Sequence, residues 1–471
     1  MGTPSAWLEA PIAEEFAGAE LGDVRRTRRL QRVAGSAADA PAAGFPQMVA
    51  DDSELEGVYR FLGNDGVEAD EILEPHVLAT LRRARESKFC LVVHDTTDFR
   101  FGGEHRRDGL GHINSHKQQG FFAHFALALL PGEERVPLGV CGLLRHSRLI
   151  RKGTRRKSWW EMCKDPTRES LRWGQLVEQV EARREGFECI HLMDREGDIY
   201  DLMAQMVRIR ARFVVRASHD RALSEGGRLQ QRLRALKPRV FRKISVAPRA
   251  DDGRSESSKQ KHPPRKGRAA RIAVAGIGVT LRRTLGAHAP EAEFPVNVVH
   301  VWEVAPPRGQ PAVAWILYTS EPIDTPEQLL TIVDHYRSRW TIEEYFKALK
   351  TGCKLEKRQL ESYHALSNAL SLFVPIAWRI LLARSLAHIP TDVPASVLLS
   401  STQLRLLTAH LALDEPPPTA QQAALAVAKL GGHLRRNGLP GWQTLGRGFE
   451  RLFWMHAGWR AANPPPRSDQ S

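Results

Sequence analysis

The pattern of hydrophobic and polar positions changes twice along the chain. Residues 1–75 have the pattern of short helices separated by polar turns. Continuous apolar runs of the kind found in strands buried on both faces then occur at 89–94, 121–130, 136–144, 189–193 and 212–218. A helical pattern at 170–184 lies between the third and the fourth run. Strands that alternate with helices in this way predict an α/β layer.

A second group of strands and a helical remainder follow. Strand-like segments lie at 240–247, 272–281, 296–304 and 313–319. Together they predict a β-rich insertion at about 220–320. One long helix is predicted at 326–350, and the chain from about 362 onward is helical, with a Pro-rich joint at 414–419. The polar, Pro-rich tail at 463–471 is predicted to be disordered.

Two aspartates stand where predicted strands end. Asp95 follows the run at 89–94, and Asp194 follows the run at 189–193. In an α/β sheet the carboxyl ends of the strands form the edge where ligands bind. Two carboxylates brought together there repel each other unless cations lie between them, and Mg²⁺ prefers such oxygen ligands. Each aspartate could also only cap a turn, so the pair leaves a metal site and a capping role open.

The long helix near 340 carries a third carboxylate among cations. Tyr336, Arg339, Glu343 and Lys350 share one stripe of a regular α-helix. A phenol, a guanidinium, a carboxylate and an ammonium group are poorly suited to packing on an apolar core. They suit a surface that holds one metal ligand among phosphate contacts. A solvated charged face would instead carry scattered charges, with no partner carboxylates elsewhere.

The net charge of the chain indicates what kind of partner it binds. The 68 Lys and Arg residues exceed the 54 Asp and Glu residues by 14, which favours a polyanion such as nucleic acid. A basic protein from a GC-rich genome is the alternative. Segments 145–157 and 254–271 each hold seven Lys or Arg residues, and a helix capped by Asp23 holds five arginines. These segments predict phosphate contacts, although each could be only a solvated loop or helix face.

Cysteine spacing and hydropathy exclude several classes of protein. The five cysteines lie far apart with no C-x-x-C pair, so neither a disulfide framework nor a zinc site is predicted, and a reducing cytoplasm fits. Residues 1–20 carry four Glu and no basic residue, unlike a signal peptide. No apolar run reaches the roughly 18 residues that span a bilayer, and we expect no membrane partner.

With these residues in place, the sequence resembles the DDE cut-and-paste transposases of the IS-four (Tn-five-like) insertion-sequence family. That family's signature, Y-x2-R-x3-E-x6-K, is filled by Tyr336, Arg339, Glu343 and Lys350. H-D-T-T around Asp95 resembles its first catalytic block, and M-D-R-E-G-D around Asp194 resembles its second. Segments that resemble other parts of the family are Leu21-Gly22-Asp23 with the arginines after it, 212–218, 315–322, Leu430-Gly431-Gly432 and the Trp442 region. The resemblance thus covers nearly the whole chain.

The resemblance implies a fold and a domain order. It implies an α/β, ribonuclease-H-like catalytic core at 76–390, interrupted by the β-rich insertion at about 220–320. A helical DNA-end-binding domain at 1–75 would precede the core, and a helical dimerisation domain at 391–471 would follow it.

The resemblance also implies roles for residues. Asp95, Asp194 and Glu343 would be catalytic and bind two Mg²⁺ ions, for which Mn²⁺ can substitute. One ion would activate the attacking oxygen and the other would stabilise the leaving oxygen. The residues assigned to DNA contact are Tyr336, Arg339, Lys350, Trp315, Lys347, Arg216, Arg25, Arg26 and Arg29. Among these, Trp315 would stack a base flipped from the duplex.

The implied function is cut-and-paste DNA transposition. The protein would bind the inverted ends of its element, cut both strands through a 3′-OH and a hairpin, and join the 3′-OH to target DNA. It would work as a homodimer on double-stranded DNA in the bacterial cytoplasm, at the nucleoid. Two alternatives stay open. One is a metal-dependent, structure-specific DNA nuclease on the same core; the other is a non-catalytic, transposase-derived DNA-binding regulator. The intact carboxylates argue against the regulator, and the end-binding and dimerisation segments argue against the nuclease.

Overall fold

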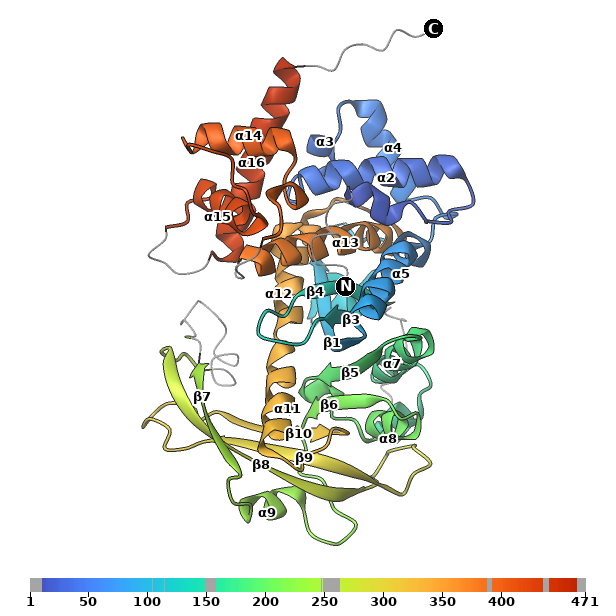
Figure 1. The fold of residues 1–471 in the computed structure, drawn as a ribbon. Coiled ribbons are helices and arrows are strands. Elements are labelled where there is room, and N and C mark those ends of the chain that lie inside the picture. Colours follow the sequence, from blue (N-terminus) through green and yellow to red (C-terminus); the bar gives the residue numbers. More distant parts are fainter. Residues whose placement is uncertain are drawn as a thin grey trace. The chain divides into compact units, whose positions relative to one another are not determined.

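The computed structural model describes residues 11–103, 105–113, 115–148, 158–246, 248, 263–387, 392–434 and 440–463. The chain divides into two compact units. Unit 1 comprises Met1–Thr154, Ala182–Glu188 and Trp340–Ser471, and unit 2 comprises Arg155–Glu181 and Cys189–Arg339. Figure 1 shows their elements in chain order. The tail at 464–471 lies outside the described residues, as do 149–157 of the first basic segment and 254–262 of the second.

The N-terminal part of unit 1 is helical, as predicted. Its elements are η1 (Ile12–Phe16), α2 (Val24–Asp39), α3 (Phe45–Met48), α4 (Asp52–Leu62) and α5 (Ala69–Ser87). Asp23 caps α2, because its Oδ1 accepts a hydrogen bond from the Arg25 backbone N–H at 2.8 Å. The domain boundary expected at residue 75 falls inside α5, and unit 1 holds these helices together with β1.

Four strands form the antiparallel sheet of unit 1. They are β1 (Phe89–Phe101), β2 (Gly111–Ile113), β3 (Ser115–Leu129) and β4 (Pro137–His146), and β3 pairs with the other three. The strands predicted at 121–130 and 136–144 are confirmed. The prediction that a strand ends before Asp95 is wrong, since β1 continues to Phe101 and pairs Asp95 with Phe125. The long ladder to β3 keeps the backbone extended, and alternation lets a polar side chain stand on one face in mid-strand.

The remaining elements of unit 1 are α12 (Thr341–Lys347), the π-helical turn η3 (Ala348–Gly352), η4 (Leu355–Lys357), α13 (Tyr363–Ala387), η5 (Ala395–Val397), α14 (Ser401–His410), α15 (Ala420–Leu430) and α16 (Trp442–Ala462). Helix α13 packs against α5, β4 and α15. It is long and apolar enough to cross a membrane, but 89 % of the relevant window is buried inside the protein. Helices α15 and α16 cross closely at two glycines. A Cβ on Gly431 or Gly448 would lie 1.9 Å from a backbone oxygen, so only glycine allows this approach.

A buried charged cluster ties η1 to the core of unit 1. The Glu15 carboxylate accepts hydrogen bonds from Arg83 Nη2 at 2.7 and 2.8 Å and lies 2.7 Å from His76 Nδ1. His76 Nε2 accepts from the Val140 N–H at 3.0 Å, so the Nδ1 proton points to Glu15. The Arg83 guanidinium lies 4.1 Å from the Trp378 ring centroid. Burial opposes the charge on Glu15, but His76 and Arg83 together lower its pKa to about 2.

This cluster predicts acid sensitivity. Because the pKa of Glu15 falls from 4.5 to about 2 on folding, its stabilisation is complete above pH 4.5 and disappears as the pH falls towards 2. At about 1.4 kcal/mol per pKa unit, the stabilisation is on the order of 3 kcal/mol. Urea unfolding should therefore show Glu15→Gln destabilised at pH 7, with a smaller difference from the unsubstituted protein at pH 3. The exposed neighbour Glu14→Gln is the control, and equal stability of the two variants at pH 7 would refute the assignment.

Unit 2 contains one mixed sheet, in the order β5–β6–β10–β9–β8–β7. Its elements are α6 (Trp159–Lys164), α7 (Leu171–Arg183), β5 (Glu188–Met193), η2 (Arg195–Gly197), α8 (Tyr200–Arg208), β6 (Arg212–Arg216), α9 (Leu229–Arg234), β7 (Val240–Val246), β8 (Arg268–Arg282), β9 (Glu293–Glu303), β10 (Ala314–Thr319) and α11 (Pro326–Ser338). Strands β5 and β6 are parallel, and the other neighbours are antiparallel. Each strand predicted in this unit is confirmed.

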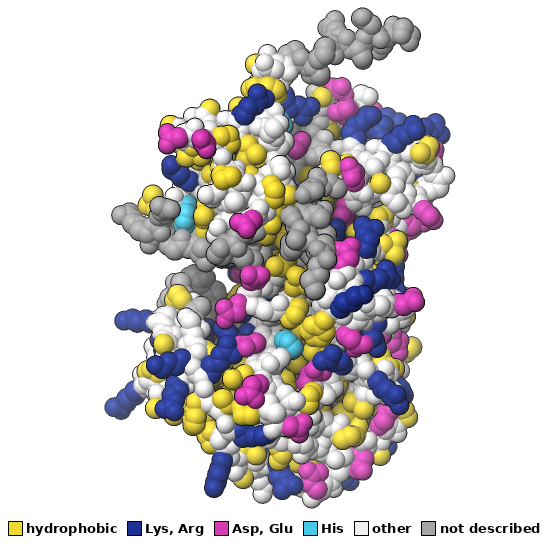
Figure 2. All heavy atoms as spheres, viewed as in Figure 1, with side chains coloured by type: hydrophobic (Ala, Val, Ile, Leu, Met, Phe, Trp, Pro, Cys, Tyr) yellow, Lys and Arg dark blue, Asp and Glu magenta, His cyan; other side chains and the backbone are white. Residues whose placement is uncertain are grey.

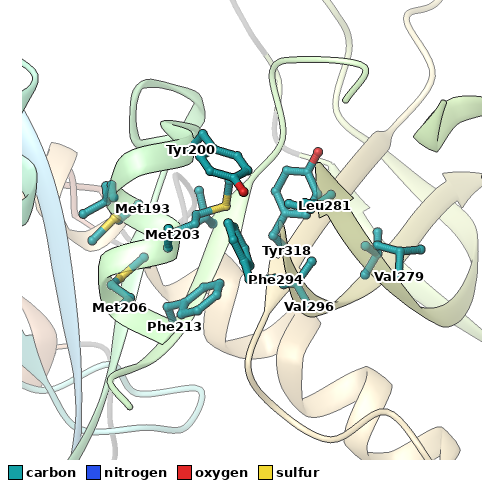
Figure 3. Close-up of a cluster of buried hydrophobic side chains, with 14 of the residues drawn as sticks. Met193, Tyr200, Met203, Met206, Phe213, Val279, Leu281, Phe294, Val296 and Tyr318 are labelled. Carbon is teal, nitrogen blue, oxygen red and sulfur yellow. The ribbon is translucent and has the colours of Figure 1, made fainter. Parts of the chain in front are cut away.

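An apolar cluster fixes α8 against this sheet (Figure 3). Met203 and Met206 of α8 meet Phe213 of β6, Phe294 of β9 and Tyr318 of β10, all at most 2 % exposed. Burying side chains of this size contributes roughly 1.5–3 kcal/mol each. The strands on either side of β10 therefore share one core with the helix that follows β5.

The prediction of a single long helix at 326–350 is wrong in detail. A capping box of Thr325 and Gln328 starts α11, which ends at Ser338. Arg339 and Trp340 keep right-handed helical angles, and α12 then begins at Thr341. A π-helical turn follows, in which the Cys353 N–H donates to the Ala348 oxygen at 2.8 Å. Lys350 therefore lies in the π-helical turn and not in the regular helix α12 that carries Glu343.

Candidate active site

Asp95 and Glu343 lie on neighbouring elements of unit 1. Half-buried Asp95 stands opposite Phe125 of β3, and its Oδ1 accepts from the Thr96 N–H at 2.8 Å. The Phe125 ring packs on Tyr345 and Phe346 of α12, with centroids 5.6 and 5.5 Å apart. Half-buried Glu343 precedes Tyr345 by two residues. The β1–β3 register and this ring packing therefore place α12 beside β1 at the level of Asp95.

The neighbouring carboxylate, Glu344, is already neutralised. Its Oε1 lies 2.8 Å from Lys347 Nζ, and its Oε2 lies 2.6 Å from Arg384 Nη1 of α13. A metal ion at Glu344 would have to displace two cations, which disfavours Glu344 as a ligand. The Lys347 side chain is half exposed, and a partly solvated pair of this kind is weak enough for a phosphate to recruit the lysine.

Lys350 reaches the strand that carries Asp95. Its Nζ lies 3.2 Å from Asp98 Oδ1, and Arg100 Nε lies 2.5 Å from Asp98 Oδ2. Burial opposes ionisation of Asp98, but the charges of Lys350 and Arg100 hold its pKa below the usual value. The sequence interpretation gave Asp98 no role. The signal available for it was an acidic residue three positions after Asp95 on the same strand.

Asp194 lies in unit 2, directly after β5, as predicted. It also caps η2, since its Oδ1 accepts from the Glu196 N–H at 2.8 Å. The pKa of Glu196 is raised, first by its burial and then by the charge of Asp194. This short turn thus concentrates two carboxylates, which is an arrangement that a bound cation would stabilise.

Residues expected to contact DNA gather around β10 in unit 2. The half-buried Trp315 ring lies 5.7 Å from the Tyr336 ring, with 59° between the planes. Arg216 Nη2 donates to the Ala314 oxygen at 3.4 Å, next to Trp315. Arg339 ends α11 with its N–H donating to the Tyr336 oxygen at 3.1 Å. The structure therefore brings Trp315, Tyr336 and Arg216 together, with Arg339 close by along the chain.

The three arginines expected at DNA ends differ in their surroundings. Arg25 is 85 % exposed and pairs with Asp23 at the start of α2, and Arg29 is exposed on the same helix. Arg26 instead donates to the oxygens of Leu21 at 3.0 Å and Gly66 at 2.6 Å, which holds the turn before α2. Figure 2 shows Lys and Arg side chains gathered over α2. Two more exposed arginines of α2, which the resemblance had not singled out as DNA contacts, are Arg28 and Arg32.

A different group of possible metal ligands lies in unit 2. The ligand atoms of Glu181, Cys189 and His191 lie within 4.8 Å of one another. These residues lie on a helix and a strand and contain one cysteine, so a search of the sequence for C-x-x-C pairs could not find them. His191 Nε2 lies 3.1 Å from Glu181 Oε1, so a hydrogen bond accounts for that contact. A thiol and an imidazole also differ from the all-oxygen ligands that Mg²⁺ prefers.

Comparison with known proteins adds two family matches. Residues 6–67 match a family described as "Transposase DNA-binding", and residues 169–374 match one described as "Transposase DDE domain". The first match includes the exposed arginines of α2, and the second includes Asp194, Trp315 and Glu343; Asp95 lies outside both. A cryo-EM structure of a piggyBac transposase synaptic complex with hairpin DNA aligns over 100 % of this chain and 83 % of that one, at 8 % identity and a TM-score of 0.36. A similarity that low supports no argument.

Proposed function

The chain contains the DNA-binding and DDE domains of a transposase, and from that premise we propose that it is a cut-and-paste DNA transposase of the IS-four (Tn-five-like) type. It would bind the inverted ends of its element, cut both strands and join the new 3′-OH to target DNA. The observation that carries the proposal is the placement of Asp95 on β1 beside α12, which bears Glu343. The third proposed carboxylate, Asp194, lies at the end of β5, within the residues that match the DDE domain.

Asp95, Asp194 and Glu343 would hold two Mg²⁺ or Mn²⁺ ions. The donors fit, because they are all carboxylate oxygens and the Asp194 turn already gathers negative charge next to Glu196. Asp95 and Glu343 belong to unit 1, and Asp194 belongs to unit 2. The ions would supply an activated oxygen nucleophile and stabilise charge on the leaving oxygen.

The chain's own side chains would position the DNA. Lys350 would exchange its Asp98 partner for a phosphate, and Arg339 would hold a second phosphate close to the scissile bond. Tyr336 supports the Trp315 ring, on which a flipped base would stack. In-line displacement at phosphorus needs little covalent chemistry from the protein, so this positioning and the charges around it carry the rate.

The larger architecture is part of the same proposal. We propose a ribonuclease-H-like core at 76–390, with β7–β10 as its insertion at about 220–320. The helices within 1–75 would bind element ends, and those within 391–471 would form a homodimer on DNA. The exposed Trp454 side chain on α16, 53 % accessible, supports a protein partner for this face. The protein would act at the nucleoid in the bacterial cytoplasm.

The direct test uses DNA that carries the inverted repeats flanking the gene. Purified protein, Mg²⁺ and a labelled end duplex should give a nick with a 3′-OH, then a double-strand break, and then a product joined to supercoiled target DNA. A duplex with scrambled ends is the control. Cutting without joined product would favour the nuclease, and end binding without any cutting would favour the regulator.

Trp315→Ala should separate the cleavage steps. Nicking needs a positioned phosphate, but hairpin formation also needs a base held out of the stack. Base–aromatic stacking is worth about 1–3 kcal/mol, so its loss should slow hairpin formation about 5- to 150-fold and leave nicking near normal. Denaturing gels of end-labelled DNA resolve the two products.

Trp302→Ala is the matched control for this substitution. Trp302 is half-buried on β9, and the strand register directs it to the opposite face from Trp315. Its loss should lower stability without a selective effect on the hairpin. Equal loss of nicking and hairpin formation in Trp315→Ala would make Trp315 a structural residue.

A further inference from the structure

A buried ion pair lies directly beyond the Asp194 turn. Asp198 follows η2, and Arg221 lies in the loop after β6; their side chains are 0 % and 3 % exposed. Asp198 Oδ1 accepts from Arg221 Nε at 2.8 Å, and the Asp198 backbone oxygen accepts from Arg221 Nη2 at 2.7 Å. Oδ2 accepts from the backbone N–H groups of Ser218 at 2.6 Å and His219 at 2.8 Å. Both carboxylate oxygens are therefore engaged within the protein.

This pair joins two loops at one end of the sheet. The first is the turn from Asp194 to Asp198, and the second is the exit from β6. The second loop is fixed to β10 in turn, because the Ala217 N–H donates to the Ile316 oxygen at 2.8 Å. At its other end the turn is held by β5, where Met193 pairs with Val215 in the parallel register. Asp194 thus stands on a four-residue connection that is anchored on both sides.

The burial of this pair needs a reason beyond stability. Taking two charges out of water is costly, and a buried pair often contributes no more stability than an apolar replacement. A fully bonded buried network does, however, hold one conformation against its alternatives. The turn itself is tight, since a Cβ on Gly197 would lie 2.6 Å from the Met193 Cβ. An open, mobile turn could not keep the Asp194 carboxylate in one place.

We infer that Asp198 and Arg221 are positioning residues that hold the Asp194 carboxylate in place for metal binding. The inference rests on the proposed function, because it assumes that Asp194 is a metal ligand. Asp198 itself is not the ligand, since its oxygens are used by Arg221, Ser218 and His219. Partners that orient a metal ligand typically change metal affinity 10- to 100-fold when they are removed.

The test measures metal binding as well as cleavage. Asp198→Asn keeps the shape of the side chain but removes its charge. Mn²⁺ binding, followed by the EPR signal of the free ion, should weaken about 10- to 100-fold, and the Mn²⁺ concentration that half-saturates nicking should rise in step. End binding in gel shifts should stay within about threefold of the unsubstituted protein, because the α2 arginines lie in another unit.

Glu303→Gln is the matched control. Glu303 forms another buried ion pair in unit 2, with Arg268 Nη1 at 2.6 Å from its Oε1, and it lies on β9 away from the Asp194 turn. This variant should lose stability and keep its Mn²⁺ affinity. Equal Mn²⁺ affinity in Asp198→Asn and the unsubstituted protein, or an equal loss in Glu303→Gln, would overturn the inference.

A second variant covers a folding failure. If Asp198→Asn does not unfold cooperatively, Arg221→Lys keeps the charge and loses the two-point contact, and it should weaken Mn²⁺ binding several-fold. Unchanged Mn²⁺ affinity in folded Arg221→Lys would then overturn the inference. An unsubstituted protein that binds Mn²⁺ but cuts no DNA would refute the proposed function instead, and the two failures are therefore distinguishable.

Discussion

Asp95→Asn, Asp194→Asn and Glu343→Gln should each abolish end cleavage, with rates at least about 1,000-fold lower. A loss of that size corresponds to about 4 kcal/mol of transition-state stabilisation, which is the several kcal/mol expected when a metal cluster loses one anionic ligand. End binding in gel shifts should remain within about threefold, because the proposed end contacts lie on α2. Cleavage and gel shift on the same labelled duplex check both halves of the prediction.

Glu344→Gln is the control for the third carboxylate. Glu344 has the same chemistry one residue along α12, but its oxygens are paired with Lys347 and Arg384. Its loss should cost at most about tenfold in rate, through the freed cations and reduced stability. Robust Mg²⁺-dependent cutting by Glu343→Gln together with an inactive Glu344→Gln would move the metal ligand to Glu344.

Reversing two charges on α2 should weaken end binding at least about 100-fold. The double variant Arg25→Glu/Arg29→Glu removes two exposed cations and places two anions beside the phosphates. At about 0.9 per phosphate contact, the slope of log K against log salt should become shallower by about 1.8. Titrations of labelled end DNA at several NaCl concentrations measure both effects.

Arg60→Glu is the matched control for these reversals. Arg60 is 73 % exposed on α4 and pairs with Glu56, so its reversal tests one charge reversal, half the change in net charge of the double variant, at a position outside α2. Arg26→Ala should act differently and lower the melting temperature, because Arg26 fastens Leu21 and Gly66. Normal end binding by the double variant would refute the assignment of α2 to DNA ends. Point reversals leave α5 and Glu15 intact, whereas a deletion of residues 1–75 would cut through α5 and remove Glu15.

Much of the fold could be predicted because buried strands are read from continuous apolar runs. The runs at 121–130 and 189–193 became β3 and β5 with errors of a few residues. The end of β1 could not be predicted, since Asp95 to Asp98 looks like a polar turn until the ladder to β3 is known. The break between α11 and α12 was hidden for a similar reason, because every residue around Arg339 is compatible with a helix.

In the candidate site, too, local features could be predicted from the sequence and long-range contacts could not. Asp194 and Glu343 are predicted as site residues from local pattern, spacing and the family resemblance. The ion pairs that decide the state of the site join residues that are distant in sequence, such as Asp98 with Lys350 and Asp198 with Arg221. Nothing in a local pattern shows that Glu344 pairs with Arg384 of α13. Which side chains form ion pairs depends on how the helices and strands pack, and a single sequence does not determine that packing.

The continuous sheet of unit 2 has a mechanical consequence. Met193, Val215 and Tyr318 stand in one row across β5, β6 and β10, joined by backbone hydrogen bonds. Such a row resists stretching far more than loops do, so β10 cannot move relative to β5 without breaking several bonds together. The strands that carry Trp315 and end at Asp194 therefore belong to one hydrogen-bonded sheet. A displacement of the Trp315 strand would therefore carry the Asp194 end of β5 with it.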